Sequence, residues 1–401
     1  MQNGEYWPEA EGPLAGVRVV DMTRLAAGNM VTRMLADFGA EVIKIERPGI
    51  GDDLRGFGEG RVWWKEYARS KKSFTLDFRQ EEGAALLNDL IARSDMLVEN
   101  FVPGTLEKWG LGPEELWKTQ PGLVIVRVSG YGQTGPYAGK PGFGTLVEAL
   151  TGFAAMTGFE DKPPLLPPMA LADMIAGIAG FGASVVALFA RDKGRVRGQV
   201  VDVSLFEPLF SVIGPWLAHY KANGKIPVRE GNRSKIAAPR NAYRCADGKY
   251  LALSASMQSM WEKVAIAIGR RELIEDPRFR TGRDRVDNMY ELDDIVGGFV
   301  GAKTLQENLD HFGAAGVTVG PICDPTDLID HEYIRGRAVA EDYPDADHGT
   351  IPLHTPFPRL SETPGTIRAP APELGEHTDE VLALLGRGAA DCERLRKAGI
   401  V

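Results

Sequence analysis

One carboxylate stands near the start of a long apolar stretch. Residues 167–190 read PPMALADMIAGIAGFGASVVALFA before the next charged residue, and Asp173 is their only charge. Aspartate is a preferred N-cap, where its oxygen accepts backbone N–H bonds of the first helical turn, and this stretch alone favours such a cap. A helix cap is therefore the interpretation of Asp173 that this stretch favours when it is taken by itself.

Four loops in the first half of the chain carry positive charge. They read ERPGIGD, RSKKS, ENFVPGTLEKWG and SGYGQTGP, and they supply Arg47, Lys71, Lys72 and Lys108. Each charge taken alone is best explained as a solvated surface group. A local group of cations on a chain of formal net charge -9 nevertheless suggests a phosphorylated ligand.

Other familiar catalytic machinery is missing from the sequence. The first strand-to-helix turn, TRLAAGNMVTRM, holds only Gly28, so the glycine fingerprint for NAD or FAD is absent, although a helix start there can accept another anion. The six histidines show no metal-ligand spacing, and no G-x-S-x-G elbow or P-loop occurs. The three cysteines lie far apart, which argues against disulfides and zinc. We expect no metal site.

Alternating strands and helices must position these groups. GVRVVDM (16–22) and EVIKIE (41–46) are predicted strands around a helix that Gly39 ends. KSFTLDF, DMLVENF and GLVIVRVSGYG continue the strands, with helices at EEGAALLNDLIARS and PEELWKTQ between them. This alternation predicts a doubly wound, mostly parallel, Rossmann-like α/β domain, whose ligands bind at the carboxyl ends of the strands.

The pattern changes after GQVVDVSLFE (198–207). We place a large domain over residues 1–205, a linker helix over 206–220 and a smaller α+β domain over 221–330. The smaller domain is expected to hold a hairpin that turns at ADG and helices at MQSMWEKVAIAIG and TLQENLDHFGAAG.

Composition narrows the class of protein. The 401 residues are 44% hydrophobic and 25% charged, as in globular proteins, and an acidic chain without basic blocks is a poor nucleic-acid binder. The N-terminus does not resemble a signal peptide, and Met174–Ala190 is short and glycine-rich for a membrane span. We expect a cytoplasmic protein with neither nucleic-acid nor membrane partners.

The same segments resemble family III CoA-transferases over nearly the whole chain. The resemblance rests on PLAGVRVVDMTRLAAG, MLADFGAEVIKIERPGIGDDLR, SKKSFTLDFR, DMLVENFVPGTLEKWGLG, SGYGQTGPY and LGEHTDEVL in that order. It implies that Asp173 is the nucleophile, which forms an aspartyl anhydride and then an aspartyl-CoA thioester. CoA and acyl-CoA would be substrates, with no permanently bound cofactor. Ile175, Ala176, Ile178 and Ala179 would form a dry wall, and Gly177 would leave room for the pantetheine arm.

The resemblance also implies a set of CoA contacts. Arg47 matches an arginine that contacts the nucleotide, and the other implied contacts are Ser70, Lys71, Lys72, Ser73, Asn100, Phe101 and Lys108. Lys108 replaces an arginine of formyl-CoA transferase, Ala26 replaces a glutamine, and that enzyme's glycine run has no counterpart in REGNRSKIAAPRN. These departures speak against formyl-CoA and oxalate as the native substrates.

Two alternatives stay open. An α-methylacyl-CoA racemase needs a histidine where Phe143 stands, and a phenyl ring cannot accept a proton. A non-catalytic CoA-binding protein would keep the cations and use Asp173 only as a cap. Trp63, Trp64 and Tyr67 are either part of an acyl pocket or, as we expect, packing residues.

The resemblance further implies an interlocked homodimer. Residues 331–401 would then be a return segment that completes the large domain. The acyl donor, the carboxylic acid acceptor and the pathway are not specified by these residues.

Overall fold

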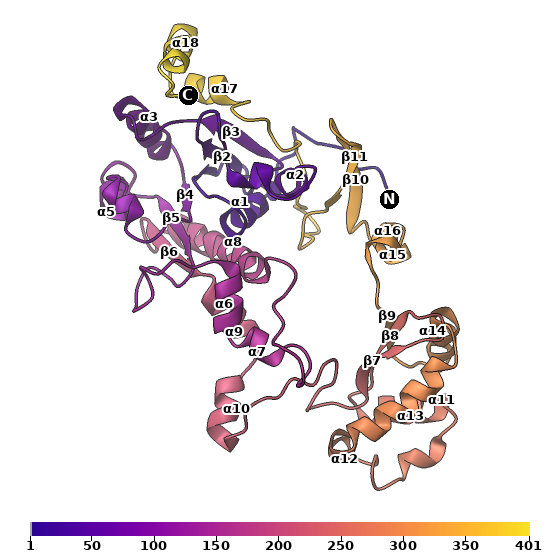
Figure 1. The fold of residues 1–401 in the computed structure, drawn as a ribbon. Helices are drawn as coiled ribbons and strands as arrows, with labels where there is room; N and C mark the ends of the chain where they lie inside the picture. The colour runs from indigo at the N-terminus through magenta and orange to yellow at the C-terminus, as the bar shows by residue number, and fades with distance from the viewer. Residues whose placement is uncertain (1) are drawn as a thin grey trace. The chain divides into compact units, whose positions relative to one another are not determined.

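The computed structural model describes residues 2–401, which divide into two compact units (Figure 1). The first unit holds residues 2–153, Leu166–Gly224 and Glu332–Val401. The second holds Ala154–Leu165 and Lys225–His331. The chain therefore leaves the first unit twice and returns to it, and its last seventy residues belong there.

A six-stranded parallel sheet is the centre of the first unit. Its strands lie in the order β3-β2-β1-β4-β5-β6, and every pair is parallel. Their bounds are β1 Arg18–Asp21, β2 Glu41–Glu46, β3 Lys71–Thr75, β4 Met96–Glu99, β5 Val124–Ser129 and β6 Gln199–Ser204. This order is that of a doubly wound fold and confirms the predicted α/β class. The order reverses direction between β1 and β4, which places the ligand crevice beyond their carboxyl ends.

Helices cover both faces of this sheet. One apolar core joins alternate strand residues such as Val20 and Leu97 to α3 (Glu81–Ala92), α5 (Pro113–Thr119), α17 (Thr378–Leu384) and α18 (Ala389–Lys397). The other core joins Val19 and Val98 to α1 (Ala27–Asp37), α6 (Gly144–Leu150), α8 (Leu171–Asp192) and α9 (Phe206–Val212). Because side chains alternate along a strand, burial on both faces explains the nearly continuous apolar strands.

Helix α8 packs closely on α1. A Cβ added to Gly177 would lie 2.5 Å from Met30 side-chain atoms, and one at Gly180 would lie 2.9 Å from Val31. Gly177 therefore makes room for α1, and the expectation that it leaves space for pantetheine is wrong. By length and composition α8 alone, among the described residues, could cross a membrane, although core helices of globular proteins meet the same criterion.

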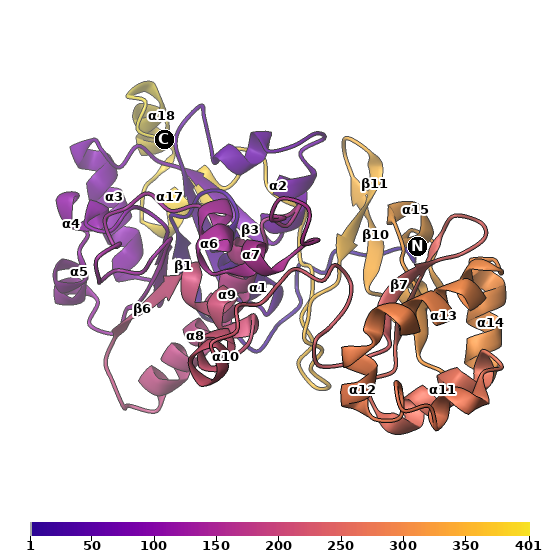
Figure 2. The same ribbon diagram turned by 60° about the horizontal axis from the view of Figure 1, so that its bottom comes forward.

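The return segment adds elements that the sequence did not reveal. β10 (Ala340–Asp345) and β11 (Gly349–His354) form an antiparallel hairpin (Figure 2). Farther on, the chain borders the edge strand β3: Thr75 Oγ1 lies 2.9 Å from Thr378 Oγ1, and Gly375 N donates to Ser73 Oγ at 2.9 Å. Asp77 N donates to the carbonyl oxygen of Ile400 at 2.7 Å. The C-terminal residues therefore cover β3 and the segment after it.

Shorter helices complete the first unit. Their bounds are α2 Val62–Tyr67, α4 Thr105–Lys108, α10 Trp216–Asn223 and α16 Glu332–Gly336, with a 3-10 turn at Asp53–Gly56. Residues 206–220, expected as one linker helix, hold α9 and the start of α10. Gly214, at φ 98°, lies between these two helices.

The second unit is a small α+β body. Strands β7 (Arg240–Arg244), β8 (Tyr250–Ser254) and β9 (Val319–Pro321) form an antiparallel sheet in that order. Its helices are α11 Gln258–Ala267, α12 Gly282–Asp287, α13 Met289–Gly301 and α14 Leu305–Ala314, with α15 at Pro325–Leu328 and a 3-10 turn at Arg271–Ile274. The predicted hairpin turns at Gly248, whose φ is 83°. The short helix α7 (Phe153–Met156) lies where the chain first enters this unit.

Candidate active site

Asp173 is the third residue of α8 and not its N-cap. The N-cap position is Ala170, whose side chain makes no capping hydrogen bond. The carboxylate of Asp173 accepts hydrogen bonds from its own backbone N–H and from that of Ala27. Glu148 Oε1, on α6, accepts from Ala172 N at 3.1 Å and so satisfies one of the free N–H groups of the helix start. The first turn of α8 thus has a capping carboxylate other than Asp173.

Gly144 provides the space that the Asp173 carboxylate occupies. A Cβ at residue 144 would lie 2.2 Å from Asp173 Oδ2. Gly144 is the first residue of α6, so the absence of its side chain lets the start of α6 approach the start of α8.

The surroundings of Asp173 raise its pKa to about 6. Burial is the largest cause, and the negative charge of Glu148 adds to it. The two backbone N–H groups act in the opposite direction. A carboxyl with this pKa is mostly ionised near neutral pH, and it is more basic than an ordinary aspartate. The group therefore combines negative charge with sparse hydration, as a carboxylate nucleophile requires.

Two cavities meet at Asp173. The first, of about 360 Å³, lies at the carboxyl ends of β1, β4 and β5, and Arg24, Asn100, Phe101 and Lys140 help to line it. The second, of about 630 Å³, is bordered by Glu148 and by the apolar residues Leu54, Phe57, Trp63, Pro167 and Met169. Asp173, Leu25, Ala26 and Phe143 line both. A ligand in either cavity can therefore reach the carboxylate.

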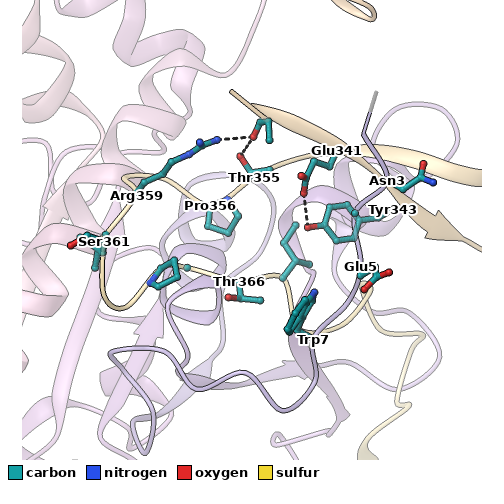
Figure 3. A pocket seen from close by; sticks show the side chains of 16 residues that line it. Asn3, Glu5, Trp7, Glu341, Tyr343, Thr355, Pro356, Arg359, Ser361 and Thr366 are labelled. Atoms are coloured by element: carbon teal, nitrogen blue, oxygen red, sulfur yellow. Dashed lines mark hydrogen bonds between the residues drawn. The ribbon is translucent and has the colours of Figure 1, made fainter. Parts of the chain in front are cut away.

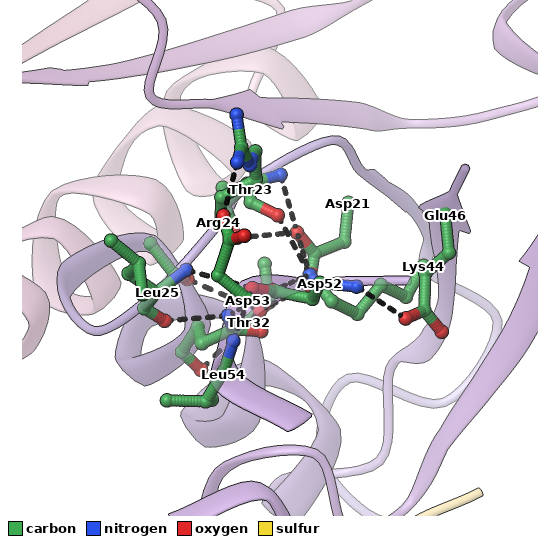
Figure 4. A network of polar contacts seen from close by, with 12 residues as sticks. Asp21, Thr23, Arg24, Leu25, Thr32, Lys44, Glu46, Asp52, Asp53 and Leu54 are labelled. Carbon is green, nitrogen blue, oxygen red and sulfur yellow. Dashed lines mark hydrogen bonds and ion pairs between the residues drawn. The ribbon is translucent and has the colours of Figure 1, made fainter. Parts of the chain in front are cut away.

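Buried polar contacts hold the loop between β1 and α1 that separates these cavities (Figure 4). Asp52 Oδ1 accepts from Leu25 N at 3.0 Å, and Lys44 Nζ donates to the carbonyl oxygen of Thr23 at 2.8 Å. Leu25 has a φ of 58°, a left-handed conformation that is uncommon for leucine. Asn100 Oδ1 accepts from Arg24 N at 2.9 Å, and its Nδ2 donates to the Arg24 carbonyl at 2.7 Å. These bonds fix the backbone that presents Ala27 N–H to Asp173.

Among the other predicted site residues, Asn100 and Phe101 line the first cavity with Asp173. Arg47 and Lys108 are exposed, the latter on α4. Their predicted contacts with CoA stay predictions.

The stretch Ser70–Ser73 is occupied by contacts within the protein. Lys71 is 2% exposed, and its Nζ lies 3.1 Å from Asp21 Oδ2 and 2.7 Å from Thr32 Oγ1. Lys72 pairs with Glu41 and Glu380. Ser70 Oγ accepts from Arg368 N, and Ser73 Oγ donates to Glu46 Oε2 at 2.6 Å. The geometry therefore supports structural roles for these side chains; their predicted contacts with CoA are untested.

Three charged residues near Asp173 escaped the sequence analysis. Arg24 pairs with Asp53, Lys140 Nζ lies 3.5 Å from the ring centroid of Tyr137, and Glu148 is buried beside α8. Arg24 had a usable signal, because it lies two residues after the end of the first predicted strand. Glu148 had none, since only the packing of α6 on α8 brings it to Asp173.

Among the aromatic residues Trp63, Trp64 and Tyr67, one lines a cavity and another packs inside the protein. Trp63 lines the larger cavity and stacks on Tyr67, with ring centroids 5.5 Å apart. Trp64 is fully buried and donates from Nε1 to the carbonyl oxygen of Pro372 at 3.1 Å. Trp63 is thus a wall of the cavity and Trp64 a packing residue.

A third cavity, of about 540 Å³, lies between the N-terminal segment and the β10–β11 hairpin (Figure 3). Its polar side chains bond within the protein: Tyr343 to Glu341, and Arg359 to the carbonyl of Ala338. Asp173 does not line it. Across residues 2–401, no group of three or more His, Cys, Asp or Glu side chains is arranged to hold a metal ion.

Substituting Gly144 tests the close approach of α6 to the carboxylate. Gly144→Ala is expected to displace Asp173 and lower kcat/KM at least tenfold, because its new Cβ takes the place of Oδ2. Alanine has a higher helix propensity than glycine. The melting temperature of Gly144→Ala should therefore stay close to that of the wild type. Gly152→Ala, at a glycine with φ 91° and nothing near its Cβ position, gives a comparison in which strain is present without displacement of Asp173. Normal kinetics of Gly144→Ala would contradict the described approach.

Comparisons with known proteins show the family to which this chain belongs. The model of CoA-transferase family III matches residues 14–378. Succinyl-CoA--D-citramalate CoA-transferase of Chloroflexus aurantiacus is 39% identical over 97% of this chain and 98% of that protein. Succinyl-CoA:glutarate CoA-transferase of Mus musculus is 31% identical over 97% of this chain and 90% of its own length.

A solved structure supports the same conclusion. The crystal structure of a CAIB/BAIF family protein from Brucella suis has a TM-score of 0.83 and 32% identity, and it covers 94% of this chain and 100% of that one. The match of the family model over most of the chain, together with these relatives, shows that the protein belongs to CoA-transferase family III and is a CoA-transferase.

Proposed function

We propose that the enzyme moves CoA from an acyl-CoA thioester to a free carboxylic acid and that Asp173 is its nucleophile. One observation carries this proposal: a sparsely hydrated carboxylate with a pKa of about 6 stands where two cavities meet. A cap alone would not need access to either cavity.

The proposed reaction balances at each step. An Asp173 oxygen attacks the thioester carbonyl carbon, the C–S bond breaks, and CoA leaves as a thiolate with the bonding pair. The product is a mixed anhydride between Asp173 and the acyl group. The thiolate then attacks the aspartyl carbonyl, the anhydride C–O bond breaks, and the first carboxylate leaves. The acceptor carboxylate runs these steps in reverse and restores Asp173.

The two cavities suit different parts of the substrate. Arg24 and Lys140 border the smaller cavity, which fits the phosphate-bearing CoA portion better than the larger one does. The larger cavity is mostly apolar and can hold the acyl group away from water, which protects an anhydride from hydrolysis. No cofactor beyond the CoA thioester is required by these steps.

Trapping the acyl-enzyme tests the proposal. The enzyme is incubated with succinyl-CoA, the donor named for the relatives, or with uncharged butyryl-CoA, then quenched with hydroxylamine and digested. Conversion of Asp173 to a hydroxamate, found by peptide mass, is the expected result. An active enzyme that never labels Asp173 would overturn the mechanism. Rapid exchange of the α-proton of a 2-methylacyl-CoA with deuterium would point to a racemase instead.

We also propose that the protein is a cytoplasmic homodimer. Apolar side chains stay exposed along α8, α9 and α10, among them Val186, Val212 and Leu217, each more than 60% exposed. Large apolar side chains left exposed in this way are typical of an interface. Light scattering during size exclusion should give twice the chain mass of 43.6 kDa. A single-chain mass at micromolar concentration would contradict the dimer.

A further inference from the structure

Glu148 is a buried acid next to the proposed nucleophile. It lies on α6, is 2% exposed and lines the larger cavity together with Asp173. Its Oε1 accepts from Ala172 N at 3.1 Å, so it contacts the residue directly before Asp173. An acid buried this deeply requires a compensating interaction, and the start of α8 supplies one.

The helix start explains why a carboxylate is placed there. The N-cap Ala170 offers no side-chain acceptor, although the first N–H groups of a helix need partners outside it. The N-terminal end of a helix also attracts negative charge. Glu148 provides both the acceptor and the charge from a neighbouring helix. Gly144 lies one turn earlier on the same face of α6, where it leaves room for the Asp173 carboxylate.

The charges around Asp173 are unevenly distributed. Glu148 faces it from α6, and Asp173 is the only acidic residue in the first turn of α8. The β1–α1 loop contributes the Ala27 N–H, while its Arg24 is paired with Asp53. Lys140 lines only the smaller cavity. Glu148 is therefore the charged side chain that acts on Asp173 from the larger cavity, which is proposed to hold the acyl group.

We propose that Glu148 is a positioning residue of the transfer reaction, whose carboxylate fixes the first turn of α8 and keeps a negative charge beside Asp173. This inference rests on the proposed role of Asp173 as nucleophile. The repulsion between the two carboxylates makes Asp173 more basic, in line with the direction of its pKa shift.

The fixed charge has a consequence for the covalent intermediates. In the anhydride and in the aspartyl-CoA thioester, the Asp173 side chain carries no charge. Each acylation therefore relieves the repulsion from Glu148, and each release of Asp173 restores it. Glu148 thus favours the acylated enzyme over the free one.

Glu148→Gln separates the charge from the hydrogen bond. The amide oxygen can still accept from Ala172 N, so the fold and the melting temperature should be retained. The acid limb of the kcat/KM profile should move to lower pH by about one unit, because the like charge is lost. The fraction of Asp173 trapped as hydroxamate at equilibrium should fall by up to about tenfold.

Two further variants make the test decisive. Glu341→Gln changes an acid on β10 that lines neither cavity at Asp173. Its pH profile of kcat/KM should match that of the wild type. Any titration of the substrate phosphates should appear equally in both profiles. Glu148→Asp keeps the charge but withdraws it by one methylene group. It should give a smaller shift in the same direction, and it replaces the glutamine variant if that protein does not fold.

The outcomes distinguish this inference from the proposed function. If the wild-type enzyme transfers CoA without labelling Asp173, the proposed nucleophile fails and the inference fails with it. The wild type could instead label Asp173 but show the same acid limb of the kcat/KM profile and the same fraction of trapped hydroxamate as the Glu148 variants. In that case only the inference is overturned. Glu148 would then be a helix cap with no part in the chemistry.

Discussion

Replacing Asp173 by asparagine is expected to abolish CoA transfer and to make the folded protein more stable. A neutral amide cannot attack the thioester to form an anhydride, so no turnover should remain. The same change removes a charge that burial and Glu148 both disfavour in the native state. The buried charge of Asp173 thus lowers the free energy of unfolding, and the asparagine variant lacks this charge.

The sign of the pH dependence follows from the raised pKa. The folded-state pKa of Asp173 is about 6, against 3.8 as the ordinary value, so the native state favours the protonated form. Ionisation costs stability as pH rises from about 4 to about 6, and the full cost, about 1–3 kcal/mol, applies above that range. Asp173→Asn should therefore be stabilised by that amount at pH 7.5 and by almost nothing at pH 4.

Denaturant unfolding of the two proteins at both pH values measures this difference, and a coupled assay measures transfer. Asp173→Ala should also be inactive. Alanine additionally lacks the side-chain hydrogen-bond acceptor that asparagine keeps. Substantial activity in Asp173→Asn, with deamidation excluded by peptide mass, would sink the mechanism. Equal stabilities at pH 7.5 would contradict the electrostatic description of the site.

Asp21→Asn is expected to cost about 3–5 kcal/mol of stability, because it removes one member of a buried group of charges. Asp21 is fully buried, 3.1 Å from Lys71 and 3.6 Å from Lys44. It also accepts hydrogen bonds from Thr23 and Thr32. Without its charge, the two enclosed lysines would lose a shared carboxylate, and Lys44 would keep its ion pair with Asp52 at 2.9 Å.

The charge pattern gives this prediction a pH dependence. Lys44, Lys71 and two hydroxyl groups hold the pKa of Asp21 well below its usual range in spite of burial. The stability that Asp21 contributes is therefore fully present above the ordinary aspartate pKa. It is lost as pH falls through the lower pKa that Asp21 has in the folded state. Burial and the nearby Lys44 lower the pKa of Lys71 to about 8. A lysine enclosed in this way is poorly suited to bind a phosphate of CoA.

Urea unfolding near pH 7 measures the loss, and Glu82→Gln is the matched control. Glu82 pairs with Arg394 at 2.6 Å on the surface, and such exposed pairs contribute about 0–1 kcal/mol. A loss below 1 kcal/mol in Asp21→Asn would contradict the role assigned to the buried group. The KM for acyl-CoA of folded Lys71→Met would show separately whether Lys71 contacts the substrate.

The sequence predicted those features that depend on neighbours along the chain. β1, α1 and β2 follow from apolar runs and from Gly39, whose φ of 102° ends the helix as expected. Asp173 was found because an isolated charge stands out in an apolar stretch. Asn100 and Phe101 follow a strand directly, so the end of β4 brings them to the cavity.

Features that depend on packing between distant segments were not predictable in this way. The charge of Lys71 is visible in the sequence, but its burial depends on Asp21 and Thr32, which lie on other elements. Glu148 reaches Asp173 only because α6 packs on α8. The β10–β11 hairpin contains VAEDYPDADHGTIPLH, whose charges and prolines hide the usual alternation of a strand.

The cover that the C-terminal residues place over β3 also sets when this protein can finish folding. Ile400 is 4% exposed within the core of the first unit, and its carbonyl bonds to Asp77. At ribosomal rates, roughly 15–60 s separate the synthesis of these two partners. Throughout that interval the β3 edge and the apolar core beside it lack the contacts that the C-terminal residues supply. The first unit can therefore be completed only after Ile400 has been synthesised and has left the ribosome.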